Sequence, residues 1–330
     1  MYDRFGLILI LFLFAFGSCY GPRTTDATAD TSSSARLGKE GNKGAIVTLV
    51  KANPNAKPRY KILAKHNQGI EQFLYMDGID VIIFHEGELV DAHQKIIAKN
   101  TPNLPLQFVD VTETFKLYKE VNNSFCPRLQ KHSSFGPGYM SMCRFWFVDF
   151  IKYLASYDWV LRLDEDCLPL SDLRGFLADP KLTSEAHLSS SLIIDLSLAR
   201  TDAISEKGPD GAFVQNMKAF VRNFVFSNKS PLLTRFRSGT AIHTWRAPYT
   251  NCMFLNLNWY RSNKMLGEFD QAVLESQCIY SGRWGDLPLW GAKMLLAYEQ
   301  IHVLNFSYHH LSHRVKVIPG KIYGRALSRS

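Results

Sequence analysis

Apolar runs and helical repeats alternate along the first third of the chain. Residues 45–50, 79–84 and 104–111 are short apolar runs that predict strands, and the first two lack the polar alternation of a half-exposed strand. Between them, apolar side chains recur at helical spacing over residues 62–75 and 93–98. Strands that alternate with helices predict a mostly parallel, Rossmann-like α/β sheet.

Two details refine this sheet. Pro105 places the third run at a sheet edge or at the start of a strand, because proline cannot donate a hydrogen bond to a neighbouring strand. No Gly-x-Gly-x-x-Gly follows the first strand. The dinucleotide-binding fingerprint is therefore missing, which disfavours an NAD-dependent enzyme.

The same patterns continue through the middle of the chain. After the break at Gly136-Pro137-Gly138, the spacing predicts a helix over residues 139–154. Residues 159–163 and 188–196 contain further apolar runs that predict buried strands. Aromatic and aliphatic side chains at helical intervals predict another helix over residues 212–226, whose stripe indicates packing in the core.

Three acids follow the strand predicted at residues 159–163. Side chains two apart on a strand point the same way, so Asp164 and Asp166 are expected to converge while Glu165 points elsewhere. Ligands of open α/β sheets gather beyond the carboxyl ends of the strands. Two convergent carboxylates there predict a site for Mg²⁺ or Mn²⁺, with a solvated acidic turn as the alternative. A helix is expected to begin near Ser171-Asp172.

The carboxyl-terminal third contains three segments of unusual composition. Residues 249–254, 283–288 and 308–310 combine polar, chemically capable side chains with glycine, proline and aromatic residues. This combination is typical of active-site loops. No internal repeat and no second boundary divides the region, so the folded part is expected to be a single domain.

Composition narrows the class of protein. The chain has 330 residues, 46% of them hydrophobic, which is enough to bury a sizeable core. Its formal net charge of +8 is scattered along the sequence instead of forming one block. Such a charge favours anionic ligands in general, and without a nucleic-acid-binding motif we expect no nucleic-acid partner.

The amino terminus has the features of a targeting segment. Residues 1–19 contain one short apolar run, below the ~20 residues that a membrane-spanning helix needs, and predict a signal peptide or a short signal-anchor. Residues 20–42 are mostly small and polar and predict a flexible stem. Residues 43–330 then form the folded domain, which entry into the secretory pathway would place in the lumen, with membrane anchoring by the amino terminus left open.

Entry into the secretory pathway would allow the cysteines to form disulfides. None of the later cysteines forms a C-x-x-C pair, which disfavours a zinc cluster. One or two disulfides can form, and the sequence leaves their connectivity open, among Cys126, Cys143, Cys167, Cys252 and Cys278. N-glycosylation acceptors for a eukaryotic lumenal chain begin at Asn122, Asn228 and Asn305.

Several segments resemble, in order, the fungal α-1,2-mannosyltransferases of glycosyltransferase family 15. Residues 43–50 are similar to the opening strand of the family, and Tyr139 to Phe145 to its Tyr-x-x-Met-Cys-Arg helix start. Asp164-Glu165-Asp166 corresponds to a family Glu-Pro-Asp at a strand end. The late motifs are Arg283-Trp284-Gly285-Asp286-x-Pro288 and Tyr308-x-His310.

The resemblance implies a GT-A fold, in which a Rossmann-like mixed sheet is flanked by helices in a single catalytic domain. It also implies a Golgi enzyme that transfers mannose from GDP-mannose to a glycan or glycoprotein acceptor with Mn²⁺ as the divalent cation. The residues that it assigns are Asp164, Asp166 and His310 to the metal, Tyr139, Arg144, Arg162 and Asp164 to the donor, and Arg283 and Asp286 to catalysis.

The sequence departs from the family in one place that bears on mechanism. The segment after Cys252 lacks the glutamate that the family carries there, a possible nucleophile. The resemblance implies that transfer retains the anomeric configuration. The missing glutamate disfavours a covalent double displacement, so we expect a same-face route without a committed protein nucleophile.

Alternatives remain open at this point. Arg144 can pair with an acid inside the fold, and Asp286 can brace a turn after Gly285. The chain can also be a non-catalytic nucleotide-sugar binder, or use another nucleotide sugar. A glycoside hydrolase fits less well, because it needs two carboxylates about 5–10 Å apart across the scissile bond.

Overall fold

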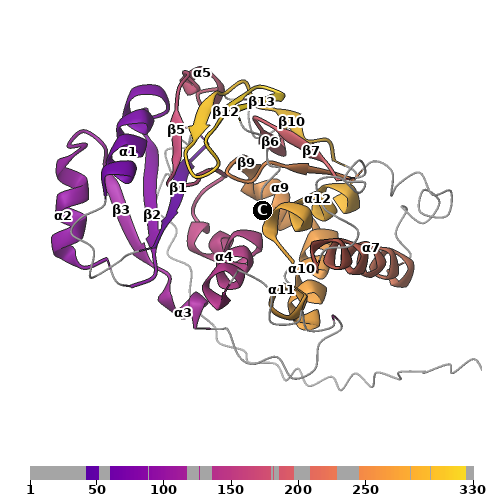
Figure 1. Ribbon diagram of the computed structural model, residues 1–330. Helices are drawn as coiled ribbons and strands as arrows, with labels where there is room; N and C mark the ends of the chain where they lie inside the picture. Colours follow the sequence, from indigo (N-terminus) through magenta and orange to yellow (C-terminus); the bar gives the residue numbers. More distant parts are fainter. Residues whose placement is uncertain are drawn as a thin grey trace, which may run out of the picture. The chain divides into compact units, whose positions relative to one another are not determined.

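The computed structural model describes residues 42–51, 60–87, 89–116, 126, 136–179, 181, 186–196, 209–228, 245–282, 284–297 and 299–324. They lie within one compact unit, residues 40–330. Its centre is a seven-stranded mixed sheet in the order β10-β6-β9-β4-β1-β2-β3 (Figure 1). The strands are β1 (Gly44–Val50), β2 (Ile79–His85), β3 (Leu106–Asp110), β4 (Trp159–Leu163), β6 (Leu188–Ser190), β9 (Cys252–Asn256) and β10 (His302–Val303).

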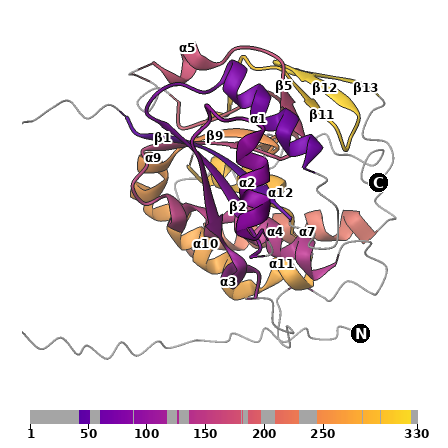
Figure 2. The same cartoon turned by 90° about the vertical axis from the view of Figure 1, so that its left-hand side faces the viewer.

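The first half of this sheet is parallel, as the sequence predicts. β1 pairs in parallel with both β2 and β4, and β2 pairs in parallel with β3. Helices α1 (Lys61–Phe73) and α2 (Asp91–Lys99) connect these strands and lie in front of the sheet in Figure 2. Pro105 precedes β3, which is an edge strand. β9 makes the sheet mixed, because it runs antiparallel to β4 and β6.

Each face of the sheet has its own core. Ile46 and Leu161 point to the face covered by α1, whereas Val47 and Val160 point to the opposite face. That opposite face packs against α4 (Pro137–Phe147), the 3₁₀ helix η1 (Asp149–Leu154) and α12 (Asp286–Ala297). The central strands are buried on both sides, which is why their sequences read as continuous apolar runs.

Two smaller sheets complete the strands. A four-stranded antiparallel sheet, in the order β13-β12-β11-β5, lies beside α1 in both views (Figures 1 and 2). Its strands are β5 (Cys167–Pro169), β11 (Tyr308–His310), β12 (Val315–Ile318) and β13 (Lys321–Gly324). The third sheet pairs β7 (Ile193–Asp195) with β8 (Arg246–Pro248). The chain therefore leaves the central sheet after β4 and enters the four-stranded sheet at once.

Short helices and one long helix account for the remaining regular structure. The predicted helix near residues 212–226 is confirmed as α7 (Pro209–Ser227). The others are α3 (Thr112–Phe115), α5 (Arg174–Leu177), α9 (Leu257–Ser262), α10 (Lys264–Ser276) and α11 (Cys278–Ser281). The helix expected near Ser171 is thus a single turn, α5.

Three sequence-based expectations were wrong. The helix predicted over residues 139–154 is two helices, because Val148 leaves helical geometry at φ −144°. The single strand predicted over residues 188–196 is two, β6 and β7, in different sheets. The late segments predicted as loops carry regular structure. β9 and β11 are strands, and Asp286 begins α12.

One disulfide joins Cys126 to Cys278, with 5.4 Å between their Cα atoms. It connects a residue that precedes α4 in sequence to the start of α11. Among the described residues, Cys143, Cys167 and Cys252 are free and buried. The structure thereby selects one of the connectivities that the sequence left open.

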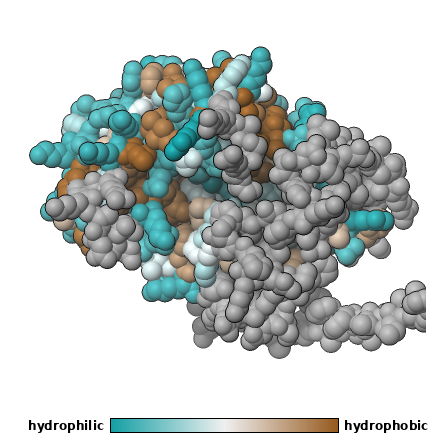
Figure 3. Space-filling model, in the orientation of Figure 1, coloured by the Kyte–Doolittle hydropathy of each residue, from teal (hydrophilic) through white to brown (hydrophobic). Residues whose placement is uncertain are grey.

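Apolar side chains at the surface are dispersed. Figure 3 shows hydrophilic residues along the outer edges of the described part and hydrophobic residues mostly between them. The large exposed ones come from different elements and turns, at Ile62, Val90, Ile96, Leu170, Val303 and Tyr323. No helix within the described ranges is long and apolar enough to cross a membrane. The predicted targeting segment and most of the predicted stem fall outside these ranges.

Candidate active site

The turn from β4 into β5 is fixed by backbone hydrogen bonds to two other strands. The Asp164 N–H donates to the Asn251 carbonyl, 2.9 Å away, just before β9. The Leu311 N–H, just after β11, donates to the Asp166 carbonyl over 3.0 Å. Within the turn, the Cys167 N–H donates to the Asp164 carbonyl over 2.9 Å. Residues 164–166 therefore have a defined position at the carboxyl end of β4.

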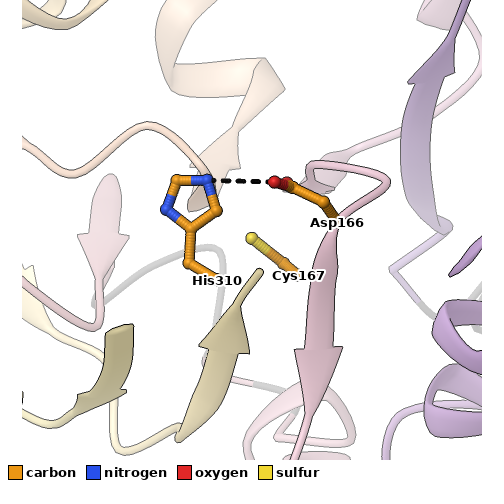
Figure 4. A group of neighbouring side chains, drawn as sticks. All are labelled: Asp166, Cys167 and His310. Carbon is orange, nitrogen blue, oxygen red and sulfur yellow. Dashed lines mark ion pairs between the residues drawn. The ribbon is translucent and has the colours of Figure 1, made fainter. Parts of the chain in front are cut away.

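Strand pairing brings His310 to this turn. β5 and β11 are antiparallel neighbours, and His310 lies opposite Cys167 in their register. As Figure 4 shows, the His310 ring faces the Asp166 carboxylate, with Nε2 3.4 Å from Oδ2. The Cys167 sulfur lies close by, so that one ligand atom from each residue falls within 4.8 Å of the others. Residues distant in sequence thus form one compact group.

The orientation of His310 is set by β9 and the residues before it. The Tyr249 hydroxyl lies 2.8 Å from His310 Nδ1, and Asn251 Nδ2 lies 3.2 Å from Nε2. Burial raises the pKa of Tyr249, so its hydroxyl keeps its proton. Metal-binding histidines generally have one ring nitrogen held in this way while the other faces the ion. Here the nitrogen that faces Asp166 is Nε2.

The donor set suits a hard divalent cation. Burial opposes the ionisation of Asp166, but hydrogen bonds with His310 and Ser312 outweigh it and lower its pKa, so the carboxylate is charged. Burial raises the pKa of Cys167 well above its usual value, which keeps a neutral thiol there and disfavours it as a ligand. Two ligands bound at right angles about 2.1 Å from one ion lie about 3.0 Å apart. A carboxylate suits both Mn²⁺ and Mg²⁺, and the softer imidazole favours Mn²⁺.

Asp164 belongs to a different group. Its Oδ1 lies 3.0 Å from Arg162 Nε, and its Oδ2 accepts from Asn251 Nδ2 over 2.9 Å. Arg162 Nη1 is 2.5 Å from Asp286 Oδ2, and the guanidinium lies over the Trp146 ring at 4.2 Å. We call Arg162 with Asp164 and Asp286 the arginine cluster. Asn251 links Asp164 to the Asp166–His310 pair, because the same Nδ2 lies 3.2 Å from His310 Nε2.

Within the arginine cluster, Arg162 and Asp286 are buried and Asp164 is partly buried. Burial alone would lower the pKa of Arg162, but the charges of Asp164 and Asp286 outweigh it and raise that pKa. Arg162 is only 2% exposed. Three of its five N–H donors contact the two carboxylates, which engages the guanidinium within the cluster. Its role toward the nucleotide-sugar donor stays a prediction.

The remaining assigned residues are dispersed around the site. Asp286, at the start of α12, is buried and pairs with Arg162. This contact is structural, as is the alternative in which Asp286 braces a turn after Gly285. Arg144 pairs with Asp149 over 2.9 Å, which is the internal ion pair considered as its alternative. Tyr139 lies in the first turn of α4 and packs, partly buried, against the cluster that contains Trp284. Arg283 lies outside the described residues.

Sequence reasoning missed the residues that orient the site. Tyr249 and Asn251 stood out only as part of a polar segment, and no role was assigned to them. Ser312 donates its N–H to Asp166 Oδ2 over 3.1 Å, and its hydroxyl contacts the same oxygen. No linear pattern marks the contacts of Tyr249, Asn251 and Ser312, because they arise between strands.

Glu165 lies within the same turn. Its pKa is raised to about 7, first by burial and then by the charges of Asp166 and Asp164.

Comparison with known proteins supports the architecture. No protein-family model matches this sequence, and no curated protein matches it by sequence. Core-mannan synthase A (CmsA/Ktr4) from Aspergillus fumigatus, solved in its Mn/GDP form, is similar over 90% of this chain and 83% of its own, with 13% identity and a TM-score of 0.59. The chain has a GT-A-type fold.

The mannosyltransferase Ktr4p gives the same result. Ktr4p from S. cerevisiae is similar over 89% of this chain and 77% of its own, with 16% identity and a TM-score of 0.55. Its complex with GDP matches over 86% of this chain and 76% of its own, with 18% identity and a TM-score of 0.50. At such identities the likeness establishes the fold, which confirms the mixed α/β sheet flanked by helices predicted from the sequence.

Proposed function

We propose that this chain is a divergent relative of glycosyltransferase family 15, a retaining, metal-dependent transferase that moves mannose from GDP-mannose to a hydroxyl of a glycan or glycoprotein. The observation that carries the proposal is the approach of His310 Nε2 to the Asp166 carboxylate, 3.4 Å, at the carboxyl end of β4. Ligands of open α/β sheets bind at that edge. Proteins of similar fold include core-mannan synthase A, described in its Mn/GDP form, and the mannosyltransferase Ktr4p.

The chain's own residues prepare this site. Tyr249 holds Nδ1 of His310, Asn251 lies beside Nε2, and Ser312 holds Asp166. A divalent cation held by Asp166 and His310 would neutralise the charge that develops on a departing diphosphate. Arg162 holds Asp164 within the arginine cluster, with Nε 3.0 Å from Oδ1. Asp166 is thus a ligand in this proposal, not a nucleophile.

Neither carboxylate of the arginine cluster is free to attack a sugar. Asp164 and Asp286 both pair with Arg162, which withdraws electron density that a nucleophile needs. This supports a same-face transfer in which the acceptor hydroxyl attacks without a covalent sugar-enzyme intermediate. The roles of Tyr139, Arg144 and Arg283 toward the donor or in catalysis remain part of the proposal.

We also place the protein in the secretory pathway, in the Golgi lumen. The Cys126–Cys278 disulfide is of the kind that persists in oxidising compartments. Asn228 and Asn305, two of the glycosylation acceptors, are exposed. Residues 1–19 would then act as a signal peptide or as a short anchor to the membrane.

A donor panel tests the function. The purified protein is incubated with GDP-mannose, other GDP-sugars and UDP-sugars, with Mn²⁺ or with EDTA, and release of nucleoside diphosphate is measured with and without mannose-containing acceptors. We expect Mn²⁺-dependent turnover of GDP-mannose and its loss in Asp166→Ala. Preference for a UDP-sugar would overturn the mannose assignment. Donor binding without turnover under any condition would favour the non-catalytic binder.

A further inference from the structure

His66 lies against the acidic turn and contacts the carbonyl of the residue that follows it. It is fully buried on α1. Its Nδ1 is 2.7 Å from the carbonyl oxygen of Cys167, and its Nε2 is 2.9 Å from Thr48 Oγ1 on β1. The Thr48 hydroxyl lies 2.8 Å from the carbonyl oxygen of Leu163. The two carbonyls are those of the residues immediately before and after residues 164–166.

The protonation state of His66 determines which groups of this network donate hydrogen bonds and which accept them. Burial lowers the pKa of His66 to about 4, although the hydrogen bond to Cys167 and the charge of Asp166 act in the opposite direction. A neutral ring carries one proton, and since a carbonyl only accepts, that proton is on Nδ1. Nε2 and the Leu163 carbonyl then share the single Thr48 proton. The whole connection is neutral and does not depend on a buried charge.

Close docking of α1 on β5 makes this reach feasible. Gly69 lies one turn after His66, and a Cβ there would approach Pro169 Cδ to 2.7 Å, well inside ordinary contact. Further along, the Leu173 N–H donates to the Phe73 carbonyl over 2.9 Å. A larger side chain at Gly69 would push α1 away from β5. His66 would then lose its contact with the turn.

We propose that Thr48 and His66 are positioning residues that hold the acidic turn and so set the Asp166 carboxylate against His310. The backbone bond from Leu311 to Asp166 also holds the turn. We call this support of the turn by Thr48 and His66 the clamp. The clamp rests on the hydrogen bonds alone, whereas its expected effect on metal affinity rests on the proposed function. Neither residue is expected to touch the donor.

The test compares His66→Leu with a matched control on the same helix. Leu63→Ala also removes a buried contact of α1, but Leu63 packs toward Val50 and Ile97, away from the turn. Two readouts are used on the full chain. One is Mn²⁺ affinity by electron paramagnetic resonance, and the other is hydrogen exchange of the Cys167 and Leu311 amides. Unfolding midpoints of both variants are measured in parallel, so that general destabilisation is separated from a local effect.

We expect His66→Leu to bind Mn²⁺ about 10–100-fold more weakly than the wild type, the usual cost of removing support behind a metal ligand. The two turn amides should exchange at least about 10-fold faster than in Leu63→Ala. His66→Asn, which can keep a donor near the Cys167 carbonyl, should recover most of the Mn²⁺ affinity and most of the protection of the turn amides from exchange. Gly69→Ala should loosen the turn as His66→Leu does.

The outcomes separate the two claims. If His66→Leu and Leu63→Ala show equal Mn²⁺ affinity and equal exchange of the turn amides, the clamp is wrong. If the wild type binds no Mn²⁺, the metal assignment of the proposed function fails, and the exchange rates alone decide the clamp. Faster exchange confined to the turn then supports it, and unchanged exchange overturns it.

Discussion

At the scale of single residues, the arginine cluster shows how far burial changes the meaning of a charged side chain. Arg162, on a central strand, is held between Asp164 and Asp286 and stacked on Trp146. A family resemblance marks such an arginine as a donor-binding residue. In this fold it satisfies two buried carboxylates, so its first effect is on the stability and shape of the site wall.

Removal of Arg162 should therefore unfold the protein more easily. Arg162→Leu leaves the buried Asp286 and the partly buried Asp164 without their cation, and breaking a buried pair in this way costs about 3–5 kcal/mol. Urea unfolding followed by circular dichroism measures the change. Arg174→Leu is the control, because its pair with Asp172 is largely exposed and its loss should leave the midpoint nearly unchanged. Equal midpoints for the two variants would contradict the stabilising role of Arg162.

At the scale of elements, prediction succeeded for the strands that read as continuous apolar runs and failed for β9 and for the end of α4. β1, β2 and β4 read as continuous apolar runs because they lie in the middle of the sheet. β9 is equally central, but Tyr249 and Asn251 precede it, and the mixed composition of this segment predicted a loop. The end of α4 at Val148 depends on a backbone angle that side-chain spacing does not encode.

Lys293 connects four helical segments below the central sheet. Fully buried on α12, it donates to the Phe147 carbonyl at the end of α4 over 2.7 Å and lies 2.9 Å from Asp270 on α10. Its Nζ also lies 2.6 Å from the Tyr260 hydroxyl on α9. Burial lowers the pKa of Lys293 to about 8, with Asp270 acting against that shift. These contacts fix the packing of helices on the face opposite α1.

Replacement of this lysine should be costly on its own. Lys293→Met leaves Asp270 buried without its cation and should lower the free energy of unfolding by about 3–5 kcal/mol. The double variant with Asp270→Leu should recover most of the loss, because an apolar pair needs no compensation. Lys264→Met, on the exposed side of α10, should change stability by less than about 0.5 kcal/mol. A double variant no more stable than Lys293→Met would contradict the pairing.

At the scale of the whole molecule, the site is assembled from segments that only the complete fold brings together. The sequence singled out Asp166 and His310, and the order of late motifs indicated a GT-A arrangement. It did not indicate that Asp164 turns to Arg162, that Tyr249 orients His310, or that His66 supports the turn. Each of these depends on the pairing of distant strands or on the docking of a helix, which no local pattern specifies.

The disulfide is a property of the entire chain as well. The two cysteines are 152 residues apart. Closure of so long a loop restricts the unfolded chain, and Cys278→Ala should cost about 2–5 kcal/mol. Alkylation of the unreduced, denatured protein followed by peptide mapping should modify Cys143, Cys167 and Cys252 but not Cys126 or Cys278. Free alkylation of Cys126 would contradict this pairing.

The central claim is that Asp166 and His310 form the metal-binding core of a mannosyltransferase. Its most direct test is the Mn²⁺ dependence of GDP-mannose turnover in His310→Ala and His309→Ala. The two histidines are neighbours on β11, but His309 is exposed and faces away from the buried His310. We predict that His310→Ala loses Mn²⁺-dependent turnover at least about 100-fold, whereas His309→Ala keeps wild-type activity. Undiminished turnover in His310→Ala would contradict the assignment.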